Sequence, residues 1–538
     1  MIPAATADAD TSTAPAAPAA GGDEPVRPPE GDDGRRSLPA VVRRRLSTVD
    51  ERLNPYSWLA AIVVTVIGGI LRIVNVDRPK GYIFDEVYYP TDAWDMLQHA
   101  VEWDEKTNGP AYVVHPPLGK WMIALGEQIF GNNELGWRIV GAVCGTLMVL
   151  ITARIAYRLF RSVVLSGAAG LLLALDGFHL VLSRTSLLDI FLGFYILLTF
   201  ACLLIDRDQR RTRWRTALET GFDPAKHRRP RFGFLRAVPW WRLLAAFFLG
   251  CAVGVKWSAA FFAPFFAILV VVWEVRARRS AGIRRPVARG IVGDIGWLLL
   301  SGVVTTVVYL GTWAGWFLTD TGYFRHWLAD NGRAEPPVLG ALINLFHYHQ
   351  EAFGFHTQLD DKHTYQSWPW QWLLLGRPVA FYWNGEGNCG APSCAAEILL
   401  LGTPLLWWSF LPALVAAAWF GIARRDWRAP AILVPVVAGM LPWYYYAIAD
   451  GRTMFSFYLL PAVPFLVLAV VYVLGAIMTP PEGLGPEKSD RQIVGAVVAG
   501  LYVLLVAACF AYFYPVFTGQ LIPYEDWSSR MWLGPRWI

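Results

Sequence analysis

Apolar stretches long enough to cross a bilayer recur along this chain and constrain its fold more than any other feature. A membrane-spanning helix needs about 20 apolar residues, and eleven stretches approach that length. With 55% hydrophobic and 17% charged residues, the composition also favours repeated spans over several soluble domains. The sequence therefore predicts an all-α polytopic membrane protein. The expected spans cover residues 58–76, 135–157, 163–181, 187–205, 238–255, 257–273, 291–318, 398–422, 429–448, 454–477 and 493–513.

The basic loops predict the orientation of these spans. Lys and Arg near span ends stay on the cytoplasmic side, and every strongly basic loop falls on one side if the N-terminus is inside. Residues 1–53, rich in Ala, Pro, Asp and Gly, are typical of a disordered cytoplasmic tail. The transmembrane domain is expected over residues 54–514, with long outer loops at 77–134 and 319–397. An odd number of spans leaves residues 515–538 as an extracytoplasmic tail.

This topology places many polar residues from span ends on the outer face, where they could share one site. Within the first outer loop, residues 117–130 carry an apolar helical stripe but are too few to span, which favours a helix lying in the membrane interface. Residues 85–103 are amphipathic in the same way. The polar residues that collect on this face are Asp85, Glu86, His115, Lys120, Arg184, Asp189, Lys256 and Arg452.

Asp85 and Glu86 are adjacent carboxylates set among aromatic residues. Asp85 could simply cap the following helix, with Glu86 a solvated neighbour. A carboxylate held against aromatic surface instead has its pKa raised, which suits a general base. Because two consecutive side chains cannot both reach one substrate atom, we expect Asp85 to act as the base and Glu86 to have a structural role.

Arg184 and Lys256 lie in short outer corners between spans. Either cation could snorkel to lipid headgroups. Arg184, however, is expected on the extracytoplasmic side, where the preference of Lys and Arg for the cytoplasmic side does not explain it. Its guanidinium can bind a phosphate through two parallel hydrogen bonds. We expect Arg184 to bind phosphate, with Lys256 as a weaker second candidate.

The second outer loop holds several histidines, among them His349, His356 and His363 at intervals of seven residues. They could line one face of a helix and bind a divalent metal. The spacing lacks the short form of a helical zinc site, and the surrounding Trp and Tyr residues favour stacking on a sugar, contact with a peptide, or an interfacial belt. We therefore expect no metal. Cys389 and Cys394 predict a small disulfide-closed loop, because this topology exposes them to an oxidising compartment.

Six motifs occur in an order that resembles one family. They are "FDEVYY", "HPPLGK", "ALDGFHLVLSRTSLLD", "GCAVGVKW", "HTYQSWPWQWLLLGRP" and "FYLLPAVPF". Together they resemble the protein O-mannosyltransferases in their actinobacterial form. The resemblance implies a GT-C glycosyltransferase with about 11 transmembrane helices, which transfers mannose from a polyprenyl phosphate carrier to Ser or Thr hydroxyls of secreted proteins. It also implies central roles for the carboxylates at Asp85 and Glu86 and for Arg184.

The mechanism that fits these expectations is an inverting single displacement on the extracytoplasmic side of the cell membrane, without a cofactor. His115, Lys120, Asp189, His356, His363 and Arg452 are further candidates for substrate binding. The expected partners are the lipid-linked mannose donor, the acceptor proteins, the bilayer and the secretion translocon. The alternatives are a GT-C enzyme with a lipid or lipoglycan acceptor, and a transporter for a polyprenyl sugar. Nucleic-acid binding has no support, because topology explains the arginine runs.

Overall fold

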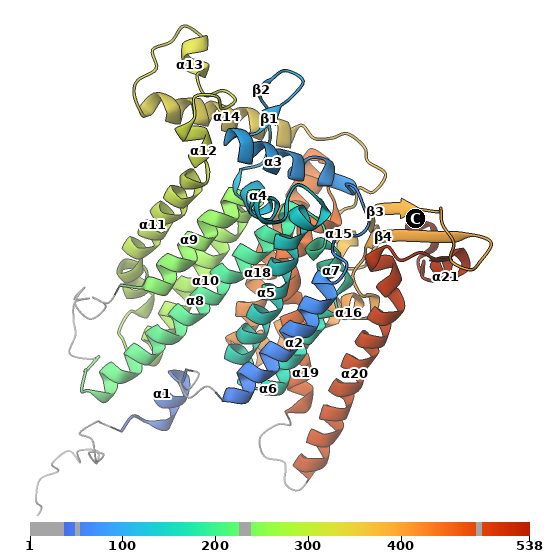
Figure 1. The fold of residues 1–538 in the computed structure, drawn as a ribbon. Coiled ribbons are helices and arrows are strands. Elements are labelled where there is room, and N and C mark those ends of the chain that lie inside the picture. The colour runs from blue at the N-terminus through green and yellow to red at the C-terminus, as the bar shows by residue number, and fades with distance from the viewer. Residues whose placement is uncertain (1–36, 49–53, 225–237, 480–486, 538) are drawn as a thin grey trace, which may run out of the picture.

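The computed structural model describes residues 37–48, 54–224, 238–479 and 487–537, and it shows a bundle of long helices with smaller elements gathered at one end (Figure 1). Over the described residues, nine helical segments are long and apolar enough to cross a membrane. They are α2 (Pro55–Ile73), α5 (Glu134–Phe160), α8 (Leu188–Glu219), η3 with α10 (Trp257–Ser280), α11 (Pro286–Thr312), α16 with α17 (Pro404–Ala423), α18 with η4 (Arg428–Asp450), η5 with α19 (Ser456–Met478) and α20 (Glu487–Thr518).

Two further segments complete the correspondence with the eleven predicted spans. One is the pair α6 (Val163–Ala174) and α7 (Gly177–Ser183), bent by 63° at the break between them. The other is α9 (Trp240–Val255), an apolar helix of 16 residues. Asn54, Asn133 and Ser162 cap α2, α5 and α6 by accepting backbone N–H groups with their side chains, so local sequence fixes where these helices begin. The predicted all-α polytopic fold is confirmed.

The first outer loop folds onto the upper end of the bundle in Figure 1. It contains η1 (Phe84–Val87), α3 (Tyr89–His99), the hairpin of β1 (Trp103–Asp104) and β2 (Gly109–Pro110), and α4 (Leu118–Phe130). The helices α3 and α4 confirm the helical pattern read from residues 85–103 and 117–130. The second outer loop contributes α12 (Ala314–Leu318), α13 (Trp327–Asp330), α14 (Leu339–Thr357) and α15 (Pro369–Trp372) at the same end.

A small antiparallel sheet departs from the predicted span at 398–422. Its strands are β3 (Val379–Asn384), β4 (Cys394–Leu400) and β5 (Ile522–Pro523), in the order β3-β4-β5. The apolar residues 398–400 are therefore the buried end of a strand, and the span begins only at Pro404. Hydropathy does not distinguish the end of this strand from the start of the span, because both consist of buried apolar residues. The predicted disulfide between Cys389 and Cys394 closes the β3–β4 connection.

The C-terminal segment packs against this sheet rather than extending as a free tail. Helix α20 continues to Thr518, β5 pairs with β4, and α21 (Tyr524–Ser529) follows. The indole of Trp527 donates a hydrogen bond of 2.6 Å to the buried Glu397. Burial raises the pKa of Glu397 to about 7. The last described residues thus hold the second outer loop in place.

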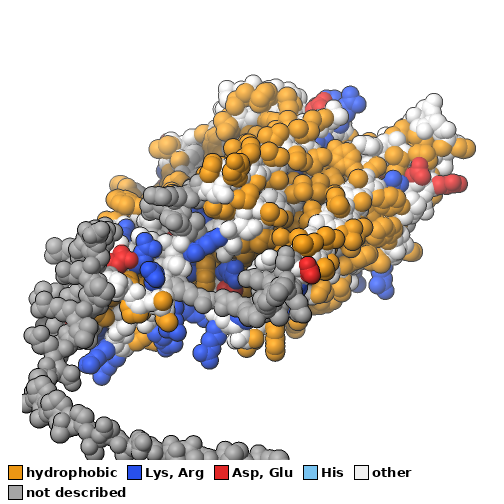
Figure 2. All heavy atoms as spheres, turned by 90° about the horizontal axis from the view of Figure 1, so that it is seen from below, with side chains coloured by type: hydrophobic (Ala, Val, Ile, Leu, Met, Phe, Trp, Pro, Cys, Tyr) orange, Lys and Arg blue, Asp and Glu red, His pale blue; other side chains and the backbone are white. Residues whose placement is uncertain are grey.

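The opposite end of the bundle carries the basic loops, as the sequence predicts. Viewed from that end, Figure 2 shows more Lys and Arg than Asp and Glu side chains. Asp294 is fully buried there and binds Arg210, Arg242 and Arg278 at 2.8 to 3.0 Å. Residues 1–36 and 49–53 of the predicted disordered tail lie outside the described residues. Within it, α1 (Ala40–Arg45) is helical, and the adjacent Leu46 is buried against α8 and α10.

Candidate active site

Asp85 and Glu86 share one short helical turn but point into different surroundings. Phe84, which precedes them, has a positive φ of 48° and stacks on Phe381 with ring centroids 4.5 Å apart. A non-glycine residue in this region is strained and needs support from its surroundings. Arg138 provides part of that support, because it contacts Glu86 and the carbonyls of Val76, Pro79 and Gly81.

Glu86 has a structural role. Its carboxylate is fully buried and accepts two hydrogen bonds from Arg138, at 2.7 and 2.8 Å. It also accepts the backbone N–H groups of Ser186 at 2.9 Å and Ile83 at 3.1 Å. Glu86 therefore ties the first outer loop to α5 and to the corner before α8. With every oxygen bonded and no exposed surface, it cannot take a proton from a substrate.

The carboxylate of Asp85, unlike that of Glu86, is partly exposed and has no hydrogen-bonded partner in the described part of the chain. Among the described residues, no side chain caps the following helix α3, so the capping interpretation is wrong. Burial raises the pKa of Asp85 to about 6, while the nearby Lys256 lowers it and Asp189 raises it. A partly exposed carboxylate with this pKa and a neighbouring cation has the properties of a general base.

Lys256 lies at the break between α9 and η3, where extended backbone interrupts two helices. Its ammonium group is 2.7 Å from Asp189 Oδ2, and both side chains are buried. Asp189 therefore fixes the lysine. The other oxygen of Asp189, Oδ1, is buried and has no hydrogen-bond partner among the described residues.

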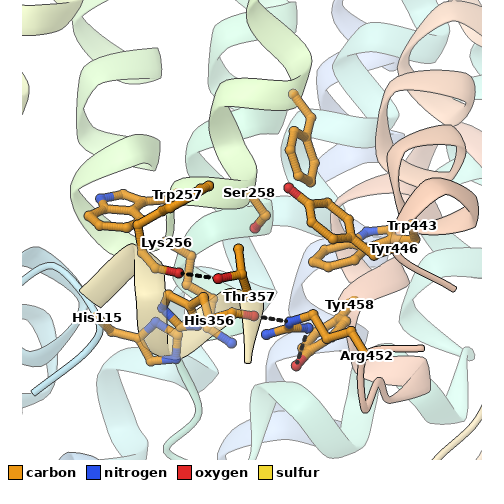
Figure 3. A pocket seen from close by; sticks show the side chains of 12 residues that line it. His115, Lys256, Trp257, Ser258, His356, Thr357, Trp443, Tyr446, Arg452 and Tyr458 are labelled. Carbon is orange, nitrogen blue, oxygen red and sulfur yellow. Dashed lines mark hydrogen bonds between the residues drawn. The ribbon is translucent and has the colours of Figure 1, made fainter. Parts of the chain in front are cut away.

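A cavity of about 250 Å³ opens beside Lys256 at the outer end of the bundle (Figure 3). Its walls come from the first outer loop, the α9–η3 break, α14, the end of α18 and η5, so segments far apart in the sequence meet there. The lining residues are His115, Lys256, Trp257, Ser258, Phe261, Phe353, His356, Thr357, Trp443, Tyr446, Arg452 and Tyr458.

Arg452 is the second cation in this cavity. Its Nε donates to the carbonyl of His356 at 2.9 Å, and one terminal nitrogen lies 3.5 Å from Tyr458 Oη, as Figure 3 shows. Over the ranges that the structure describes, no carboxylate lies within ion-pair distance of Arg452, although the side chain is only 8% exposed. A buried guanidinium without a carboxylate is a strong candidate for binding an anion.

The rings of His115 and His356 lie next to each other in the cavity wall, with centroids 5.2 Å apart. His356 Nε2 lies 2.9 Å from the carbonyl of Val114, which can only accept, so this nitrogen carries a proton. Burial lowers the pKa of both histidines, and Lys256 and Arg452 lower them further. Both rings are therefore neutral polar groups in the cavity wall.

Arg184 does not reach the cavity, contrary to the prediction from sequence. Its guanidinium donates to the carbonyls of Leu71, Arg72, Val74 and Asn75 at 2.7 to 3.1 Å. These are carbonyls at the C-terminal end of α2, which have no partners within the helix. Arg184 lies in the corner before α8, but its donors bond the carbonyls at the end of α2.

Asp85, Glu86 and Asp189 are not among the residues that line the cavity, and neither are Lys120 and His363. Lys120 is 1% exposed and is held by Glu102 and Asp92. His363 is exposed and packs against Phe455, with ring centroids 5.1 Å apart. Because α14 ends at Thr357, His363 does not continue the helix that carries His349 and His356. Within the described ranges, no group of three His, Cys, Asp or Glu residues is arranged to hold a metal ion.

The chain is thus a multi-span membrane protein whose polar cavity lies at one end of the helical bundle, where the first long loop meets the span corners. Two family profiles match the chain. One, described as the C-terminal four TMM region of protein-O-mannosyltransferase, matches residues 341–537, and one, described as dolichyl-phosphate-mannose-protein mannosyltransferase, matches residues 114–222.

Relatives of similar length support the same grouping. A polyprenol-phosphate-mannose–protein mannosyltransferase of Mycobacterium tuberculosis is 39% identical over 498 residues, covering 89% of this chain and 92% of the relative. The Corynebacterium glutamicum enzyme of the same name is 33% identical over 500 residues, covering 90% and 94%. The chain belongs to the polyprenol-phosphate-mannose–protein mannosyltransferase family, which confirms the resemblance read from its motifs.

The fold agrees with a solved structure. The Saccharomyces cerevisiae protein O-mannosyltransferase Pmt1–Pmt2 complex bound to the sugar donor superposes with a TM-score of 0.65. The alignment covers 93% of this chain and 94% of the yeast chain, at 14% identity. At that identity the likeness bears on the fold alone.

Proposed function

We propose that this protein transfers mannose from a polyprenyl phosphate carrier to Ser or Thr hydroxyls of secreted proteins, on the extracytoplasmic side of the cell membrane. The observation that carries the proposal is the closeness of a base candidate, Asp85, to Lys256, a cation that lines the outer cavity together with Arg452. The names of the relatives supply the donor and the protein acceptor.

The reaction is a single displacement. The acceptor hydroxyl oxygen attacks the anomeric carbon of mannose and gives its proton to Asp85. The bond from that carbon to the phosphate oxygen breaks at the same time, so the configuration at the anomeric carbon inverts. The carrier leaves as a phosphate monoester, whose added negative charge Lys256 and Arg452 neutralise in a site largely shielded from water.

Burial and charge suit Lys256 and Arg452 to the phosphate. Lys256 is already paired with Asp189, whereas the second terminal nitrogen of Arg452 makes no hydrogen bond to any other described residue. The neutral rings of His115 and His356 and the indoles of Trp257 and Trp443 provide hydrogen bonds and apolar surface for the sugar.

The orientation is part of the proposal. The basic loops gather at the end opposite the cavity, and Lys and Arg mark the cytoplasmic side. The cavity then faces the extracytoplasmic side, with the N-terminus cytoplasmic and the C-terminus extracytoplasmic. Acceptors reach this face as they are secreted, so we include the secretion translocon as a partner.

The decisive assay supplies purified protein in lipid vesicles with radiolabelled polyprenyl phosphate mannose and a Thr-rich peptide. Labelled peptide is the expected product. Label that appears in a lipid or lipoglycan acceptor, with none in the peptide, would overturn the protein acceptor and favour the alternative GT-C reaction.

A further inference from the structure

Trp257, which lines the cavity, is held by a chain of hydrogen bonds that leads away from it. Its indole Nε1 donates to Tyr309 Oη at 3.0 Å. Tyr309 Oη makes a short hydrogen bond with His349 Nε2. Tyr309 lies near the outer end of α11 and His349 lies on α14, so the chain joins η3 to two other elements.

The direction of each hydrogen bond follows from the chemistry of the groups. His349 Nδ1 is 2.6 Å from the carbonyl oxygen of Leu345, which can only accept, so Nδ1 carries the proton. Burial lowers the pKa of His349, which favours the neutral ring. Its Nε2 is then an acceptor for the Tyr309 hydroxyl, and that hydroxyl accepts from Trp257.

This chain bears on the cavity because Trp257 directly follows Lys256. Lys256 has extended backbone between two helical segments, and one hydrogen bond of 3.1 Å joins it to each of them, to the carbonyl of Ala252 and from the N–H of Ala259. The neighbouring indole is fixed twice, by the bond to Tyr309 and by stacking on His349 with centroids 5.3 Å apart. Fixing the residue after the break limits how far the backbone of Lys256 can rotate.

The same chain anchors the outer end of α11. Only 6% of the most apolar part of this helix is buried inside the protein, and its packing partners are α9 and α10. The bonds of Tyr309 to Trp257 and His349 connect it with the cavity wall and with the second outer loop.

We propose that Tyr309 and His349 are positioning residues, which hold Trp257 and thereby place Lys256 for the donor phosphate. The inference rests on the proposed function, because it needs Lys256 to bind that phosphate. Neither residue touches the reacting atoms; each acts through the residue it holds.

The first test is Tyr309→Phe, which keeps the ring and removes the hydroxyl that links Trp257 to His349. One such hydrogen bond corresponds to about a two- to tenfold change. We expect KM for the lipid donor to rise by about that factor, with KM for the peptide unchanged. Tyr512→Phe is the matched control, because it removes a hydroxyl that bonds Ser529 on the other side of the bundle.

The second test compares two changes at His349. His349→Gln can place a carbonyl oxygen near the position of Nε2 and accept from Tyr309, whereas His349→Leu cannot accept. We expect Gln to retain most donor affinity and Leu to lose as much as Tyr309→Phe. Because both changes break the same chain, the double variant Tyr309→Phe/His349→Leu should be no worse than either single variant.

The outcomes separate this inference from the proposed function. If the wild-type protein transfers no mannose to the peptide, the proposed function is wrong. If it transfers mannose, and Tyr309→Phe matches Tyr512→Phe in KM for the donor, or His349→Gln and His349→Leu behave alike, the positioning role is wrong while the function stands. If Tyr309→Phe fails to fold, the comparison of His349→Gln with His349→Leu still tests the positioning role. If a His349 variant fails to fold, the comparison of Tyr309→Phe with Tyr512→Phe does so.

Discussion

Replacing Asp85 by Asn tests the proposed base most directly. The change keeps the size of the side chain and removes its ability to take a proton. General base catalysis contributes typically 10²- to 10⁴-fold, which corresponds to about 3–5 kcal/mol of transition-state stabilisation. Because the Asp85 carboxylate holds no other residue in the described part of the chain, its loss should not unfold the protein.

The expected result is therefore a fall in kcat of about a hundredfold or more, with KM for the lipid donor close to wild type. The assay is peptide mannosylation under saturating donor, with the variant reconstituted at equal amount. Asp104→Asn is the matched control, because it makes the same chemical change at the end of β1, in the hairpin of the same outer loop.

The pH dependence provides a second reading of the same variant. Burial raises the pKa of Asp85 to about 6, so the carboxylate is charged above that pH and protonated below it. The wild-type kcat/KM should fall about tenfold for each pH unit below about 6. The residual rate of Asp85→Asn should lack this inflection. A variant with near-normal kcat, or with an unchanged inflection near pH 6, would refute the assignment of Asp85 as base.

Three further predictions concern the cations. Arg452→Ala should lower kcat/KM for the donor about tenfold to a hundredfold, because charge-assisted hydrogen bonds are worth about 1.5–3 kcal/mol; kinetics equal to wild type would remove Arg452 from the phosphate site. Arg184→Ala should lower the thermal unfolding temperature, since each carbonyl left without a partner costs about 1–3 kcal/mol. A raised donor KM at unchanged stability would restore the phosphate role read from sequence. Because Lys256 and Arg452 supply the positive charge, treatment with EDTA should leave the rate unchanged, and loss that Mg²⁺ or Mn²⁺ reverses would contradict this.

The spans and the gathering of polar residues at one end could be predicted from sequence because both depend on short-range patterns. Apolar length defines a span, and Lys and Arg counts define the loops. The strand β4 was missed for the same reason: residues 398–400 are as apolar as the helix that follows, and pairing with β3 and β5 is not visible in local composition.

Individual roles within the site were harder to predict because they depend on which partners the fold brings to a side chain. Arg184 and Arg452 look alike in sequence, each a single arginine in an outer corner. The fold gives Arg184 four carbonyls at a helix end, whereas it gives Arg452 two carbonyls, a tyrosine hydroxyl and an open cavity. Only the count of remaining donors distinguishes a structural arginine from one that can bind an anion.

In one strained turn, the two adjacent carboxylates have different roles: Asp85 is the proposed base, and Glu86 holds the turn in place. Consecutive residues in a tight turn point in different directions, so Glu86 can bond Arg138 while the Asp85 carboxylate interacts with Lys256. Glu86 and Arg138 also hold the turn in which Phe84 keeps its positive φ. Removing Glu86 would leave Arg138 buried without its counter-charge, which commonly costs about 3–5 kcal/mol. An inactive Glu86 variant with a lowered thermal unfolding temperature would therefore have lost the turn that positions Asp85. An inactive variant of unchanged thermal stability would instead indicate that Glu86 is a catalytic group.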